Sequence, residues 1–120
     1  MDTLSLVFQI IIALGIFNVW LLRFGRSTEW RGGEAQNMKE EFAAYGLPPS
    51  FMYFIGALKL TLAAMLVVGI WVPTLVQPAA IGMAALMVGA IAMHVKVRDA
   101  FLRAVPAACM FALSVSVVLL

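Results

Sequence analysis

The chain alternates long apolar runs with short polar stretches. Four apolar runs can be marked, at about residues 4–22, 51–72, 75–95 and 104–120. The first three hold roughly the 20 residues that an α-helix needs to cross a hydrocarbon layer of about 30 Å, and the fourth lies at the short end of that range. None of them shows the two-residue alternation of a membrane barrel strand. The pattern therefore predicts an all-α fold with four membrane-spanning helices.

The one sizeable polar region separates the first two runs and contains a second periodic pattern. Residues 34–45 carry apolar side chains at helical spacing while charged side chains face the other way. The apolar positions are Ala35, Met38, Phe42 and Tyr45. This pattern predicts a short amphipathic helix that lies on the membrane surface or caps the bundle. The expected fold is an integral membrane four-helix bundle, a single domain over residues 1–120, with this segment between helices 1 and 2.

Composition supports a membrane environment. Apolar residues make up 64% of the 120 positions and charged residues 12%, which lies outside the ordinary range of soluble domains. The first run has no Lys or Arg before it and no small-residue cleavage site after it, so we expect a retained helix and not a signal peptide. The single cysteine, Cys109, excludes an internal disulfide and a CxxC motif.

The basic residues predict an orientation. Seven of them lie in two linkers, residues 23–50 and 96–103, whereas the N-terminus, the turn between helices 2 and 3 and the C-terminus have none. The positive-inside rule places both linkers on the cytoplasmic side of the cell membrane. These residues lie beside the membrane and form no groove-reading motif, so we expect the lipid bilayer and not a nucleic acid as the partner. The tryptophans near segment ends are typical of an interfacial belt, and they are Trp20, Trp30 and Trp71.

Polar side chains inside the apolar runs indicate a site. Lys59 is the only charged residue between Phe51 and Trp71, and a charge at a helix centre costs about 2.5–3.5 kcal/mol on insertion scales. Asn18 lies near the basic-side end of helix 1, and His94 lies in the last turn of helix 3 on the same side. We therefore expect Asn18, Lys59 and His94 to converge in the cytoplasmic-side half of the bundle as a ligand-binding set.

Lys59 has no acidic neighbour within the four runs. Its candidate ion-pair partners are the loop carboxylates Glu40, Glu41 and Asp99, with backbone carbonyls, water or a ligand anion as alternatives. Each member of the set also has an ordinary structural interpretation. Lys59 could snorkel to the headgroups, His94 could bond a carbonyl, and Asn18 could bond a neighbouring helix.

Catalytic chemistry has little support in the sequence. One histidine and one cysteine provide no Ser-His-Asp set and no metal site, and no phosphate-binding glycine loop or intramembrane carboxylate pair is present. A single histidine argues against a bis-histidine haem, while a His–Met haem stays formally open. We assign no catalytic residues, and an autonomous enzyme is the least supported interpretation of the sequence.

Several motifs in order carry a family resemblance. They are Gly46-Leu47-Pro48, then Tyr53-Phe54-Ile55-Gly56-Ala57-Leu58-Lys59-Leu60, then Gly89-Ala90 with His94 four residues on, then Asp99 and Pro106. This set resembles the DoxX-like family of small four-helix integral membrane proteins. The family takes its name from a subunit of a thiosulfate:quinone oxidoreductase, and relatives have been linked to membrane oxidoreductase complexes or to the assembly and export of clients. In the family pattern the position of Lys59 is commonly acidic, so this chain reverses the local charge.

Two functions follow as expectations. The first is an accessory or binding subunit in membrane redox metabolism, partnered by a membrane oxidoreductase subunit, with Asn18, Lys59 and His94 holding a quinone or another apolar molecule with a polar head. The alternative is a structural or assembly protein that docks a partner through residues 34–45. A small transporter is the third possibility and would require a homo-oligomer, because four short helices form a small frame for alternating access.

Overall fold

The computed structural model describes residues 3–25, 31–33, 35–99 and 101–120, and these residues are helical with no strand among them. The elements in chain order are α1 (Thr3–Phe17), the π-helical turn η1 (Asn18–Leu22), α2 (Met38–Ala44), α3 (Pro49–Val68), the 3₁₀ turn η2 (Pro73–Leu75), α4 (Val76–Lys96) and α5 (Phe101–Leu119). Four helical stretches of the described chain are long and apolar enough to cross a membrane, namely Thr3–Leu22, Pro49–Val68, Pro73–Lys96 and Phe101–Leu119. The prediction of an all-α membrane fold is confirmed.

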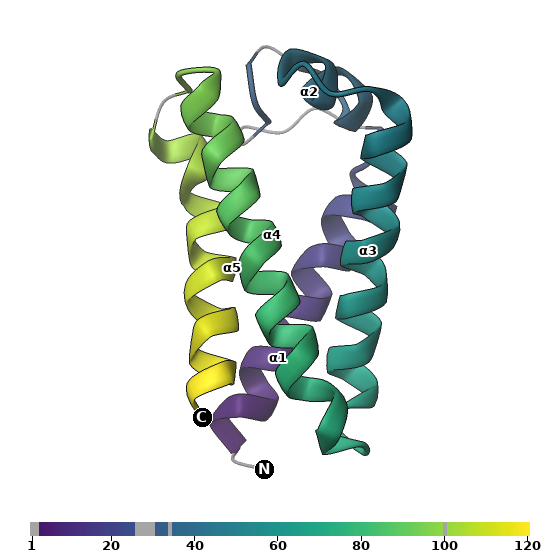
Figure 1. Cartoon of the computed structure of the whole chain (residues 1–120), viewed down its shortest axis with the longest axis vertical. Helices are drawn as coiled ribbons and strands as arrows, with labels where there is room; N and C mark the ends of the chain where they lie inside the picture. The colour runs from purple at the N-terminus through teal and green to yellow at the C-terminus, as the bar shows by residue number, and fades with distance from the viewer. Residues whose placement is uncertain (1–2, 26–30, 34, 100) are drawn as a thin grey trace.

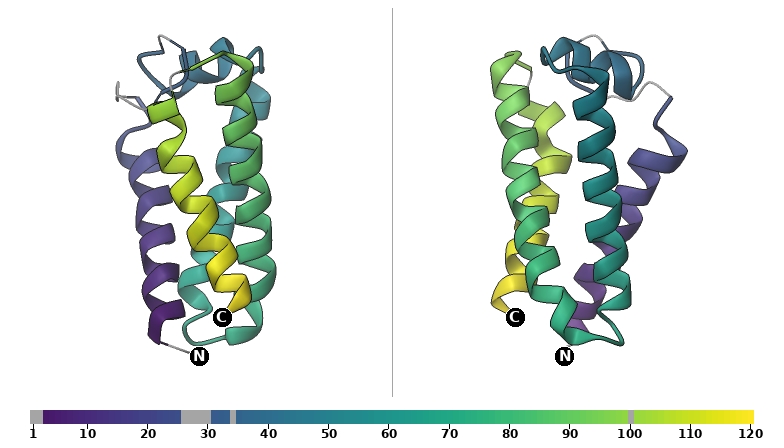
Figure 2. Two further views of the ribbon diagram at one scale, coloured as in Figure 1. Left: turned by 90° about the vertical axis from the view of Figure 1, so that its left-hand side faces the viewer. Right: turned by 45° about the vertical axis from the view of Figure 1, so that its right-hand side comes forward.

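The four long helices lie side by side along the long axis of the molecule (Figure 1). α1 packs against α3 and α5, and α4 packs against the same two helices, so the four form a ring. The two termini lie at one end, while α2 and the turn between α4 and α5 lie at the other, as both views of Figure 2 show. The two linkers that carry the basic residues therefore share one end of the molecule.

The boundaries of α2 follow from its local sequence. The helix covers only Met38–Ala44 of the expected residues 34–45, because Asn37 is extended and its side chain accepts a hydrogen bond from the Glu40 amide at 2.8 Å. This N-cap starts the helix, and Gly46 with φ of +80° ends it. Glu34 lies outside the described residues. The face predicted to be apolar is buried, and its members are Ala35, Met38, Phe42 and Tyr45.

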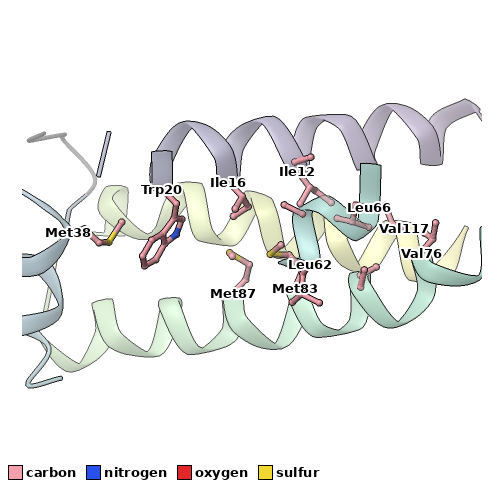
Figure 3. Packing of buried hydrophobic residues seen from close by; sticks show 14 of the residues in the cluster. Ile12, Ile16, Trp20, Met38, Leu62, Leu66, Val76, Met83, Met87 and Val117 are labelled. Atoms are coloured by element: carbon pink, nitrogen blue, oxygen red, sulfur yellow. The ribbon is translucent and has the colours of Figure 1, made fainter. Parts of the chain in front are cut away.

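The buried apolar cluster runs from Met38 and Phe42 of α2 past Trp20 into the half of the bundle nearer the termini. Side chains from all four long helices point toward one another there (Figure 3). Its buried members include Ile12, Ile16, Leu62, Leu66, Met83 and Val117. The fully buried Gln9 joins α1 to α3 in this half, because its amide donates to the Leu66 carbonyl at 2.9 Å. The half nearer α2 contains the candidate site.

Candidate ligand-binding cavities

A π-helical turn at the end of α1 carries Trp20. The amide of Arg23 donates to the carbonyl of Asn18 at 2.9 Å, five residues back instead of four. Trp20 lies within this turn and is only 7% exposed. The expectation of an interfacial aromatic belt is therefore wrong for Trp20, whereas Trp71 is 75% exposed and Trp30 lies outside the described residues.

Gly56 of α3 makes room for the Trp20 indole. A Cβ atom added at Gly56 would lie 2.5 Å from ring carbon Cζ3 of Trp20, closer than any real contact. The ring therefore lies directly on the backbone of α3, and the edge of Phe42 from α2 meets it with centroids 6.0 Å apart. Trp20 thus fills the space where α1, α2 and α3 meet.

Lys59 lies over this indole. It is three residues beyond Gly56, so it projects from the same side of α3. Its Nζ atom is 5.5 Å from the centroid of the Trp20 ring, within the range of a cation–π contact. Within the described part of the chain, the structure shows no hydrogen bond or ion pair between this ammonium and a carboxylate. The partner that the structure shows for the Lys59 ammonium is the face of the Trp20 ring.

Two cavities meet at Lys59. The first, of about 300 Å³, lies between α3 and α4 beneath α2 and has walls such as Phe51, Ile55, Leu86 and Met93. The second, of about 330 Å³, lies between α1, α4 and α5, with walls such as Gly15, Met87, Ala107 and Met110. Six residues line both cavities, and they are Val19, Trp20, Glu41, Lys59, Ala90 and His94. The Trp20–Lys59 pair therefore belongs to the wall that the two cavities share.

The structure brings the three expected site residues to this region in different ways. Lys59 and His94 line both cavities, whereas Asn18 lines only the second. The side-chain oxygen of Asn18 accepts a hydrogen bond from Arg23 Nε at 3.4 Å. His94 is buried and its Nδ1 lies 2.8 Å from Asp99 Oδ2. Its Nε2 is thus the ring nitrogen that a ligand could use.

The carboxylate of Glu41 lines both cavities and is bonded to three other groups of the protein. It pairs with Arg31 at 2.9 Å, accepts from the Gly32 amide at 3.1 Å and accepts from the Tyr45 hydroxyl at 2.8 Å. Burial and the neighbouring Glu41 charge raise the pKa of the Tyr45 phenol well above its ordinary value. Glu41 therefore shares the cavities with Lys59 while it is paired with Arg31.

The other two candidate partners are engaged elsewhere. Glu40 is exposed, and its carboxylate accepts from the Asn37 amide at 2.8 Å. Asp99 pairs with His94, accepts from the Gly33 amide at 2.9 Å and lies 3.3 Å from the guanidinium of Arg103. Neither Glu40 nor Asp99 lines a cavity.

A cap segment, residues 31–33 and 35–45, covers the α2 end of the bundle and contributes Arg31, Met38, Glu41, Phe42 and Tyr45 to the cavity walls. Arg103 of α5 donates to the carbonyls of Arg31, at 3.1 Å, and of Gly33. Lys96 of α4 donates to the Tyr45 carbonyl at 2.7 Å. The apolar face of α2 packs inward, so a partner that docked on this segment would meet its outer, polar face, where Lys39 and Glu40 are exposed.

Sequence reasoning missed Trp20 and Arg31 as parts of this site. Gly56 carried a signal, because a small residue one turn before an intramembrane lysine predicts the close approach of a neighbouring group. Trp20 carried none, since its inward direction depends on the π-helical turn. Arg31 looked like one of several membrane-flanking cations, yet it is 4% exposed.

Comparisons with known proteins agree with the motif pattern. A family model described as the DoxX-like family matches residues 9–117, which is nearly the whole chain. No curated protein and no solved structure gives a significant match.

Proposed function

Because the chain belongs to the DoxX-like family of membrane proteins, we propose that it is an accessory or binding subunit in membrane redox metabolism. The occupant of its cavities would be a quinone or another apolar small molecule with a polar head. The observation that carries the proposal is the ammonium of Lys59. It lies midway along a membrane-length helix, lines two cavities and has an aromatic ring as its partner.

The cavities suit a small lipid-soluble molecule. Ligand pockets commonly enclose about 300–1,000 Å³ and combine apolar walls with a few polar groups. Each cavity here falls at the lower end of that range, and together they offer both an apolar region and the donors Lys59 and His94. A quinone carbonyl accepts hydrogen bonds, so Lys59 Nζ or His94 Nε2 could orient such a ring.

In this proposal the chain binds and orients, and a partner membrane oxidoreductase carries out electron transfer. We place the cap segment on the cytoplasmic side, because the two basic linkers lie at that end of the molecule. The site would then lie in the cytoplasmic half of the bilayer, below the headgroups.

The test is extraction of the purified protein with organic solvent, followed by mass spectrometry of the extract. We expect a defined lipid-soluble molecule from the native chain and its loss from Lys59→Met. Lys39→Met removes an exposed lysine at the same end of the molecule and should keep the ligand, which makes it a matched control. The proposal fails if no defined molecule co-purifies and added quinone binds Lys59→Met as tightly as the native chain.

A further inference from the structure

The two cavities differ in charge. Among the described residues, the cavity between α1 and α5 is lined by one carboxylate, Glu41, by His94 and by four Lys or Arg side chains, which are Arg23, Arg31, Lys59 and Arg103. Of the described residues that line the cavity between α3 and α4, Lys59 is the only Lys or Arg, and the other titratable side chains there are Glu41, Tyr45 and His94. The basic excess therefore belongs to the α1–α5 side.

Two of these four cations form no ion pair with a carboxylate of the described residues. Arg31 pairs with Glu41 at 2.9 Å and Arg103 with Asp99 at 3.3 Å. Among the described residues, Arg23 has a long hydrogen bond to the Asn18 amide oxygen, at 3.4 Å, and Lys59 has the Trp20 ring. Within the part of the chain that the structure describes, this cavity is thus lined by two cations on different helical elements, the exposed Arg23 and the deeper Lys59, that form no ion pair with a carboxylate.

The positions of the two cations fit an amphiphile whose head lies at the membrane surface. Arg23 directly follows the span that ends at Leu22, and Arg103 is the third residue of α5, so both lie where lipid headgroups lie. Lys59 is deeper, and its four-carbon stem lets the ammonium reach toward the same end. Below them the walls are apolar and include Ile16, Met87, Ala107 and Met110.

We propose that the polar head of the occupant is an anion of the phosphate or carboxylate class, bound between Lys59 and Arg23 in the α1–α5 cavity. The inference rests on the proposed function, since the occupant is the same lipid-soluble molecule, and it adds that its head is acidic. An arginine fork matches a phosphate or carboxylate in two parallel hydrogen bonds. An anionic head also offsets the cost of holding Lys59 away from water.

The test uses Trp20 as a fluorescent reporter in a Trp30→Phe/Trp71→Phe background. The protein is reconstituted with phosphatidylglycerol or phosphatidylcholine that carry brominated chains, which quench a nearby indole. We expect phosphatidylglycerol to quench Trp20 at a mole fraction about tenfold lower, the factor that one charge-assisted hydrogen bond supports. Lys59→Met and Arg23→Gln should each remove the difference, and Arg23→Lys should keep most of it.

Controls separate the charge at the site from charge in general. Lys39→Gln removes an exposed lysine on α2 that lines neither cavity, so it should retain the preference for phosphatidylglycerol. Inorganic phosphate added in detergent identifies the source of the anion. Competition by phosphate means that a free anion fills the head site, whereas its failure together with selective lipid quenching means that the head must be carried by a lipid.

Two results would overturn the inference of an anionic head. Only the second would also overturn the proposed function. If both lipids quench equally while a neutral quinone quenches in a Lys59-dependent manner, the head is not an anion and the proposed function stands. If no lipid, phosphate or quinone shows any dependence on Lys59 or Arg23, the proposed function falls with the inference.

Discussion

Replacing Lys59 with methionine should make the empty protein more stable. Lys59 is the eleventh residue of the 20-residue helix α3, which places it about 15 Å from the first residue of that helix. A lysine at such a depth costs about 2.5–3.5 kcal/mol on insertion scales. The contact with the Trp20 ring returns about 0.5–2 kcal/mol. The difference predicts a gain of about 0.5–3 kcal/mol for Lys59→Met, since methionine fills nearly the same volume and leaves no hole.

The assay is thermal unfolding in detergent after exhaustive delipidation. For a chain of this length, 1 kcal/mol corresponds to a shift in Tm of about 4 °C, so we expect a rise of roughly 2–12 °C for Lys59→Met. Leu60→Met, at the adjacent position of the same helix, controls for the effect of introducing methionine and should not raise Tm. Addition of the native ligand should reverse the order of the two proteins. A Tm for delipidated Lys59→Met at or below that of the native chain would refute the reasoning.

Two further predictions concern the surroundings of the site. Gly56→Ala places a Cβ 2.5 Å from the Trp20 ring, so it should lower the free energy of unfolding by about 1–3 kcal/mol through overpacking and shift the fluorescence maximum of Trp20. The control is Gly89→Ala, whose added Cβ meets nothing within 4 Å. It should leave the fluorescence maximum unchanged and the stability unchanged or slightly improved. Burial and Glu41 raise the pKa of Tyr45, so the folded state keeps the phenolic proton that the unfolded state loses near pH 10. The stabilisation from this proton should be fully present below that pH. Above it, the free energy of unfolding should fall by about 1.4 kcal/mol per pH unit. Denaturant melts between pH 9 and 12 should therefore show a shallower decline for Tyr45→Phe, and parallel profiles would contradict the assignment.

The helices could be predicted because their signal is local. Each apolar run is as long as a bilayer is thick, and the inward face of residues 35–45 follows from spacing alone. Boundaries depended on single residues. Asn37 starts α2 later than the periodicity suggests, and α5 starts at Phe101, before the expected Ala104, so that Pro106 lies inside the helix.

The site was predictable only in part, because its geometry depends on contacts between helices. Depth along each helix was enough to bring Lys59 and His94 to the same cavities. The choice of partners was not local. The sequence offered three equivalent carboxylates as partners for Lys59. In the structure Glu41 pairs with Arg31 and Asp99 pairs with His94, and Lys59 contacts the Trp20 indole instead. These pairings form where the cap segment contacts α4 and α5. The spacing of residues along one helix does not predict contacts between such distant segments.

The cap segment also sets the order in which the protein can be completed during synthesis. Its bonds reach across 51 residues to Lys96, 66 residues to Asp99 and 72 residues to Arg103. A chain is made from its N-terminus, and its early parts settle first. α1 and α3, the helix that carries Lys59, are therefore made before α4 and α5. The walls of both cavities are complete only after these last two helices have packed. A molecule that reaches Lys59 from the membrane in that interval would therefore contact the site before the cap segment is bonded to α4 and α5.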